Sequence, residues 1–193
     1  MKRMILVGAL TVAALLFGVS AASSSGLNLK TFGTGDVFVN GSKGATFNDD
    51  GEYGGFYRAK TSNRLLTDPK IDLSFHNLRA VGGGAPRFSI PIDEDNDGVT
   101  EAYAFIDVNG CGVPHPMNMT STENTACQVF YSGDGGTYTN WDAFAAAHPT
   151  WRLAKKEVVG TKPNGKPQYG DTMPFIIADV TGDYLVEDIV LSY

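Results

Sequence analysis

Residues 86–112, PRFSIPIDEDNDGVTEAYAFIDVNGCG, contain the pattern that decides the fold class. Within Arg87–Ile92, Phe and Ile side chains recur at every second position, as on a strand with one buried face. Thr100–Asp107 carries Tyr, Phe and Ile and indicates a second strand. The acidic segment Asp93–Gly98 lies between them and ends in Asp-Gly, a strong turn signal. The stretch therefore predicts an antiparallel hairpin.

Similar short β-rich segments recur along the chain, separated by Gly, Asn and Asp turns at intervals of about ten residues. The expected strands are Leu27–Phe32, Asp36–Asn40, Gly55–Lys60, Lys70–Leu78, Arg87–Ile92, Thr100–Asp107, Cys127–Tyr131, Trp151–Val159, Met173–Val180 and Tyr184–Tyr193. In the last strand, Leu185, Ile189 and Leu191 are expected to share a face with Glu187. The pattern predicts an all-β chain whose residues 23–193 form a single-domain β-sandwich.

One segment departs from the β pattern. Residues 139–148, TNWDAFAAAH, are rich in alanine, begin with helix-capping residues and end before Pro149. They predict one short helix with Trp141, Phe144 and Ala145 on the same face. Gly160–Gly170 contains two Lys-Pro pairs, and we expect it to be a mobile loop.

The N-terminus has the features of a secretory signal peptide. Two basic residues precede the apolar run Ile5–Val19, which is followed by small residues and is short for a membrane span. Cleavage after Ala21 or after Ala22 fits the pattern equally, and an uncleaved N-terminal anchor is the alternative. We expect residues 1–22 to be a signal peptide. The mature protein would then be secreted, extracellular or at the cell surface, without membrane insertion.

The net charge of the mature chain indicates which classes of partner it is expected to bind. Loss of the signal would change the formal net charge from −6 to −8, because two of the 15 basic residues leave and all 21 acidic residues stay. The remaining chain has no run of Lys or Arg. We therefore expect it to bind neither nucleic acid nor anionic membranes.

The chain has two cysteines, Cys111 and Cys127. In an oxidising compartment they predict one disulfide, which closes a loop of about 17 residues and stabilises the fold by about 3 kcal/mol. A two-cysteine metal site near His115 is the alternative, although no fourth ligand is evident.

The acidic segment is also a candidate calcium site, because its spacing is that of calcium loops with oxygen ligands. The expected ligands are Asp93, Asp95, Asp97, Val99 through its carbonyl group, and Glu101. Ala104 stands where an EF-hand would have a bidentate Glu, so a helix–loop–helix site is not expected. The alternative is a solvated hairpin turn whose charges keep the sheet edge soluble.

Aromatic residues around the predicted helix are candidates for a sugar-stacking surface. They are Trp141, Trp151, Tyr131, Tyr138 and Tyr169. The alternative is that the two tryptophans pack the helix onto the sheet, because large aromatic side chains are usually well buried.

Catalytic signals are weak in this sequence. It contains no Gly-x-Ser-x-Gly, His-Glu-x-x-His or P-loop motif, and His76, His115 and His148 lie on separate segments. Its acidic residues cluster in turns, so the carboxylate pairs that a glycosidase needs are not singled out. We therefore expect the protein not to be an enzyme.

Five segments follow one another in a familiar order. They are the strand Lys70–Phe75, the glycines Gly82–Gly84, the segment Pro86–Ile106 with its Asp/Gly turn, the tryptophan helix Trp141–His148 and the closing strand Val186–Leu191. This order resembles the jelly-roll β-sandwich domains of secreted microbial proteins, some of which are related in fold to carbohydrate-binding modules. The resemblance covers residues 70–193 and implies a jelly-roll-like topology.

We expect a secreted, non-catalytic binding or adhesion module, with carbohydrate or a cell-surface polymer as the favoured ligand and calcium as a candidate structural ion. The first alternative is a structural cell-surface or matrix protein without a small ligand. The second is a glycoside hydrolase. Exposed Trp and Tyr side chains would favour binding, and buried ones the structural alternative.

Overall fold

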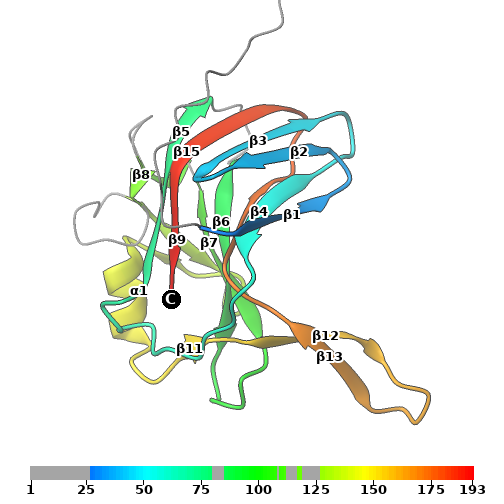
Figure 1. The fold of residues 1–193 in the computed structure, drawn as a ribbon. Helices are drawn as coiled ribbons and strands as arrows, with labels where there is room; N and C mark the ends of the chain where they lie inside the picture. Colours follow the sequence, from blue (N-terminus) through cyan, green and yellow to red (C-terminus); the bar gives the residue numbers. More distant parts are fainter. Residues whose placement is uncertain (1–26, 80–84, 108, 112–116, 119–126) are drawn as a thin grey trace, which may run out of the picture.

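The computed structural model describes residues 27–79, 85–107, 109–111, 117–118 and 127–193. These residues form two antiparallel sheets that pack face to face, together with a projecting hairpin (Figure 1). The prediction of an all-β sandwich is confirmed. The expected signal peptide lies outside the described residues. Within the described ranges, no helix has the length and apolar character needed to cross a membrane.

The two sheets are called sheet A and sheet B. Sheet A contains, in spatial order, β1 (Leu29–Gly33), β4 (Gly54–Arg58), β14 (Phe175–Ala178), β6 (Arg87–Asp93), β7 (Ala102–Asp107), β9 (Val129–Tyr131) and β10 (Thr137–Tyr138), and β11 (Arg152–Leu153) also pairs with β6. Sheet B contains β2 (Asp36–Asn40), β3 (Lys43–Asn48), β15 (Gly182–Ser192), β5 (Asp72–Arg79) and β8 (Met117–Asn118). The projecting hairpin consists of β12 (Lys156–Thr161) and β13 (Pro167–Asp171).

The chain passes repeatedly from one sheet to the other, as in a jelly roll. It leaves sheet A after β4, returns for β6 and β7, and crosses again on either side of β8. The C-terminal strands then enter the middle of both sheets: β14 lies between β4 and β6, and β15 lies between β3 and β5. The pairs that build the sandwich therefore join distant parts of the sequence.

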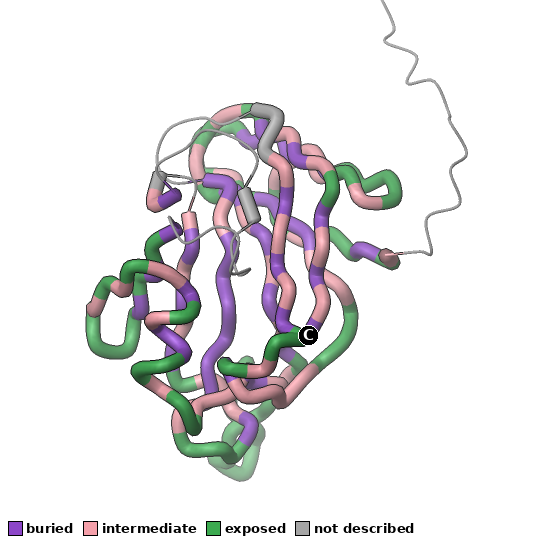
Figure 2. The backbone as a smooth tube through the Cα atoms, turned by 90° about the vertical axis from the view of Figure 1, so that its left-hand side faces the viewer, coloured by how far each residue is buried: buried purple, intermediate pink, exposed green. Residues whose placement is uncertain are grey.

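The core lies between the two sheets (Figure 2), and buried residues alternate with more exposed ones along β3, β7, β9 and β14. Phe88, Ile90 and Ile92 on β6 are fully buried, as predicted. Ser89, Pro91 and Asp93 are buried too, so β6 is covered on both faces and not on one face only. The Phe88 ring contacts Phe75 of β5, with 5.1 Å between the ring centroids, and so links sheet A to sheet B.

The last strand differs from the expected pattern. Val186, Ile189 and Leu191 are buried together, whereas Leu185 is only half-buried. The reason is a bulge in β15 between Glu187 and Val190, where the register against β5 shifts. An extra residue at a bulge reverses the alternation beyond it. The predicted shared face of Leu185 with Ile189 and Leu191 is therefore wrong.

Four strands lie where none was expected, namely β3, β8, β10 and β13. β3 pairs with both β2 and β15, and β13 pairs with β12 across most of the segment that was predicted to be a loop. Pro167 is the first residue of β13, a position that needs no ladder hydrogen bond from its nitrogen. The expected strand Trp151–Val159 is divided between β11 and β12.

The predicted disulfide and the predicted helix are both confirmed. Cys111, in the short 3₁₀ helix η1 (Asn109–Cys111), is bonded to Cys127, and both are fully buried. Helix α1 (Trp141–Ala147) begins after Asn140, whose Oδ1 accepts a hydrogen bond from the Ala143 backbone N–H at 2.8 Å. Its buried residues are those predicted, Trp141, Phe144 and Ala145.

Replacing Phe144 by Ala should destabilise the protein by about 3–5 kcal/mol, because the fully buried ring would leave a cavity. Phe38→Ala is the matched control: its ring is 59% exposed, so the expected loss is within about 0.5 kcal/mol. Denaturant unfolding of both variants measures the difference. Equal midpoints for the two would show that the helix does not pack as described.

Candidate binding and metal sites

A row of aromatic side chains crosses the outer face of sheet A. Strand pairing sets Tyr57 opposite Phe175, Phe175 opposite Ser89, Ser89 opposite Phe105, and Phe105 opposite Phe130. Their neighbours along the strands face the core, so these side chains face outward. The small Ser89 separates two pairs of rings and is itself buried.

Two further rings, Phe32 and Tyr103, connect the members of this row. The Phe32 centroid lies 5.3 Å from that of Phe175 and 6.2 Å from that of Tyr57. Tyr103 lies 6.2 Å from both Phe175 and Phe105. We call these six residues, Phe32, Tyr57, Tyr103, Phe105, Phe130 and Phe175, the aromatic row. Phe130 is exposed and the others are half-buried. Such a contiguous, partly exposed apolar surface is a candidate binding face.

Gly55 allows Phe32 to lie close to the sheet. A Cβ atom on Gly55 would be 2.6 Å from Cζ of Phe32 and 2.2 Å from the carbonyl oxygen of Ile176. A side chain at position 55 would therefore clash with the Phe32 ring and with the backbone of the neighbouring strand β14. The absence of a side chain at Gly55 therefore allows the Phe32 ring to take its position at this end of the aromatic row.

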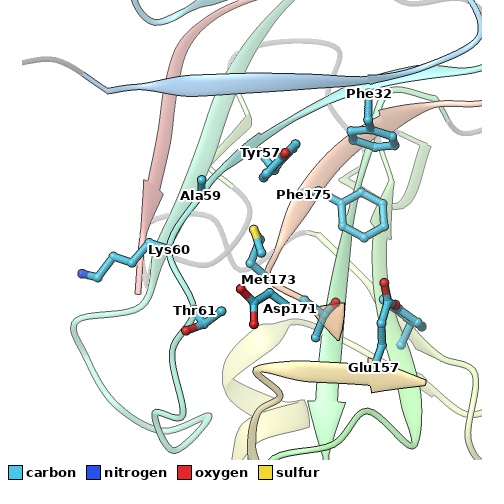
Figure 3. Close-up of a pocket in the computed structure, with 11 residues that line it drawn as sticks. Phe32, Tyr57, Ala59, Lys60, Thr61, Glu157, Asp171, Met173 and Phe175 are labelled. Carbon is cyan, nitrogen blue, oxygen red and sulfur yellow. The ribbon is translucent and has the colours of Figure 1, made fainter. Parts of the chain in front are cut away.

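A pocket with a volume of about 600 Å³ lies beside the aromatic row (Figure 3). Its lining residues are Phe32, Tyr57, Ala59, Lys60, Thr61, Tyr103, Glu157, Asp171, Thr172, Met173 and Phe175. The rings come from β1, β4, β7 and β14, whereas Glu157 and Asp171 come from the base of the projecting hairpin. The pocket thus combines an apolar wall from sheet A with polar groups from the hairpin and from the segment after β4.

Tyr103 joins the two walls. Its Oη donates a hydrogen bond to Oε2 of Glu157 at 2.7 Å. Burial, and then this carboxylate, raise the pKa of Tyr103 to about 12. Tyr103 is therefore protonated at neutral pH and holds the Glu157 side chain at the pocket wall.

The predicted sugar-stacking surface around the helix is not exposed as expected. Trp141 is 4% exposed and Tyr131 is 1% exposed. Trp141 Nε1 donates a hydrogen bond to the Leu66 carbonyl at 3.2 Å, and the rings of Trp141 and Tyr131 both pack on Phe144. These two residues are corrected to core residues, because the apolar face of α1 needs partners at this end of the sandwich.

The other two predicted binding residues are half-buried. Trp151 stacks on His148, with centroids 3.6 Å apart and rings 12° from parallel. Tyr138 Oη lies 2.8 Å from Nε2 of the same His148 and donates to Asp134 at 3.1 Å. Their rings therefore have partners within the protein. Tyr169 is 48% exposed but lies on β13 of the projecting hairpin, away from the helix.

The aromatic row was missed in the sequence, although β7 contains a signal. Ala102, Ala104 and Ile106 alternate with Tyr103, Phe105 and Asp107. The structure turns the alanines inward, because the strand packs closely in the core, and turns the large rings outward. Large aromatics opposite an alanine face indicate a surface that binds something rather than one that forms the core.

The acidic segment brings four of the predicted calcium ligands together. One oxygen from each of Asp93, Asp95, Asp97 and Glu101 lies within 4.8 Å of the others. Partial burial and the three aspartate charges raise the pKa of Glu101 above its usual value, although its hydrogen bond from a backbone N–H opposes the shift. Val99, the fifth predicted ligand, donates its backbone N–H to Oδ1 of Asp97 at 2.7 Å.

Hydrogen bonds within the acidic segment and contacts from a distant segment both hold this turn. Asp93 is fully buried and accepts hydrogen bonds from the backbone N–H groups of Asn96, at 2.7 Å, and Gly98, at 2.9 Å. Arg152 Nε donates to Oδ1 of Asn96 at 2.6 Å. The side chain of Lys155 lies so close to Gly98 that a Cβ there would be 2.7 Å from Lys155 Cε. Basic side chains from another segment thus approach the acidic turn.

The raised pKa of Tyr103 predicts a loss of stability at alkaline pH. Unfolded tyrosine ionises near pH 10, whereas folded Tyr103 does so near pH 12, so its contribution is complete below about pH 10 and is lost as the pH rises through 12. Unfolding of the wild type and of Tyr103→Phe should differ most at pH 7–9, with the wild type more stable. The difference should narrow between pH 10 and 12. A constant difference over that range would contradict the Tyr103–Glu157 interaction.

Comparison with protein-family models, curated proteins and solved structures gave no match to this chain. The resemblance to jelly-roll domains therefore stays a prediction from the order of the segments, and the fold shown is that of an all-β sandwich. A fold of this kind accommodates many activities. Function has to be inferred from the chemistry of the pocket, the aromatic row and the acidic segment.

Proposed function

We propose that this protein is a secreted, non-catalytic module that binds carbohydrate in the pocket beside the aromatic row. The observation that carries the proposal is the set of partly exposed rings on the outer face of sheet A, which a core does not require. Sugar rings present apolar C–H faces and polar hydroxyl edges. An aromatic wall combined with a few polar groups is complementary to both.

The polar groups of the pocket suit hydroxyl-rich ligands. Glu157 and Asp171 offer carboxylate oxygens that accept hydrogen bonds, and Lys60 and Thr61 offer donors. The volume of about 600 Å³ lies within the range of pockets that hold small ligands. We expect a short sugar segment to enter the pocket and to contact Phe32, Phe175 and Tyr103 through its apolar faces.

The positions of the carboxylates and aromatic rings distinguish the proposed function from its two alternatives. A structural protein without a ligand is favoured by the burial of Trp141 and Tyr131, but it does not explain the partly exposed rings on the outer face of sheet A. A glycoside hydrolase would use a carboxylate pair, and the pocket contains Glu157 and Asp171. Since Tyr103 already donates to Glu157, we assign these groups to ligand binding.

Replacing Phe175 by Ala should weaken binding to the preferred glycan at least about tenfold, equivalent to about 1.4 kcal/mol, because its ring lines the pocket and contacts both Phe32 and Tyr103. The glycan is first identified on an array, and its affinity is then measured by calorimetry. Phe38→Ala, a matched change on sheet B, should bind like the wild type.

A second variant, Glu157→Gln, tests the polar wall and should weaken binding without changing the fold seen by circular dichroism. Unchanged affinity in both Phe175→Ala and Glu157→Gln would show that the glycan binds elsewhere. Absence of glycan binding by the wild type would contradict the proposal itself. Release of sugar fragments from the bound glycan would favour the hydrolase.

We also propose that the acidic segment binds calcium as a structural ion. The proposal is supported by the convergence of Asp93, Asp95, Asp97 and Glu101, since calcium prefers several oxygen ligands. The bound ion would offset the repulsion between carboxylates that share one turn. Arg152 donates a hydrogen bond to Asn96 of this turn, and the Lys155 backbone N–H donates to the Gly98 carbonyl, so calcium would add to contacts that already hold the turn.

Calcium should raise the melting temperature of the wild type, because an ion that binds only the folded state stabilises it by about 2.7 kcal/mol at a hundredfold excess over its Kd. The double substitution Asp95→Asn, Asp97→Asn should abolish the rise. Asp49→Asn, Asp50→Asn is the charge-matched control at another exposed turn and should retain it. If calcium has no effect on the wild type while the first double variant melts higher, the segment is only a repulsive turn.

A further inference from the structure

An imidazole and two carboxylates converge on the outer face of sheet B. His76 lies on β5, and Glu187 and Asp188 lie on the neighbouring strand β15, with Glu187 directly opposite His76 in the register. His76 Nδ1 is 3.8 Å from Oε1 of Glu187 and 3.9 Å from Oδ2 of Asp188. One donor atom from each of the three lies within 4.8 Å of the others.

The bulge in β15 produces this convergence. Consecutive residues of a regular strand point to opposite faces, so Glu187 and Asp188 would normally be separated by the sheet. Here Asp188 has a φ of 50°, and the following residue, Ile189, is the next one to enter the core. The Ile189 backbone N–H donates to the Ser42 carbonyl at 3.0 Å, which anchors the bulge. Both carboxylates therefore lie outside the core, beside His76.

The distances suit a shared ion better than direct hydrogen bonds. At 3.8 and 3.9 Å, His76 Nδ1 is too far from either carboxylate oxygen for a hydrogen bond. Two ligands that are each about 2.1 Å from a tetrahedral metal lie about 3.4 Å apart, so small side-chain rotations would bring these donors to that separation. Lys43 Nζ binds the other oxygen of Glu187, Oε2, at 2.8 Å and leaves Oε1 directed toward His76.

We propose that His76, Glu187 and Asp188 bind a divalent transition metal, with zinc as the best fit to one imidazole and two carboxylates. The three side chains leave a fourth position for water or for a group from a partner. The ion would tie β5 to β15. The site is on sheet B, so it is separate from both the pocket and the acidic segment.

The test measures zinc binding by calorimetry in the Asp95→Asn, Asp97→Asn background, which removes carboxylates of the acidic segment. One zinc ion per chain should bind, and His76→Ala should lower the affinity at least about tenfold. Asp188→Asn should do the same, because Asn tolerates a positive φ and keeps the bulge intact. Asp36→Asn, a charge-matched change at an exposed position on sheet B, should leave the affinity unchanged.

The variant Lys43→Gln should change the zinc affinity in the opposite direction. Its positive charge lies beside Glu187, so its removal should raise zinc affinity only if the ion binds at this carboxylate. In Asp188→Gly, the glycine adopts the positive φ without strain, so this variant should fold at least as well as the parent. It should nevertheless lose zinc binding, because the carboxylate is absent. Unchanged zinc affinity in His76→Ala and in Asp188→Gly, or no saturable binding by the parent, would overturn the proposal.

Discussion

The insertion of the C-terminal strands into the middle of both sheets is the constraint on which the rest of the structure depends. β14 supplies the partner that joins β4 to β6, and β15 supplies the partner that joins β3 to β5. Their inward residues, including Ile176, Val186 and Leu191, are almost fully buried. Without these strands, sheet A and sheet B would each be divided, and the core between them would be open on both sides.

The same strands carry residues of two of the proposed sites on their outer faces. β14 contributes Phe175 to the pocket, and β15 contributes the two carboxylates next to His76. An antiparallel sandwich needs apolar side chains only on the inner face of each sheet, so the outer faces are free to differ. In this protein the outer face of sheet A is aromatic, whereas that of sheet B carries a cluster of ionisable groups at the bulge.

The acidic segment and the pocket are joined through the backbone. Thr100 donates its N–H to the Lys156 carbonyl at 2.9 Å, and Lys156 donates to the Gly98 carbonyl at 3.0 Å. Lys156 is the first residue of the hairpin strand that carries Glu157, so backbone hydrogen bonds connect the end of the acidic turn directly to the strand that forms the polar wall of the pocket.

Local patterns in the sequence determined the all-β class, the core-facing residues of β6, the short helix with its cap, the Cys111–Cys127 pair and the clustering of the aspartates in one turn. Each depends on residues a few positions apart or, for the disulfide, on there being a single pair. Local patterns did not predict that the other face of β6 is covered as well. Tertiary structure decided which aromatics are exposed: Trp141 and Tyr131 are buried because α1 packs on the end of the sandwich, whereas Tyr103 and Phe175 face outward. Tertiary structure also placed the bulge in β15, beyond which the alternation of buried and exposed residues is reversed. The pairing of β5 with β15 brought His76 next to Glu187, which is more than a hundred residues away in the sequence. Strand periodicity predicts that a strand has two different faces, but it does not predict which face packs into the core. That depends on how distant segments of the chain pair with one another.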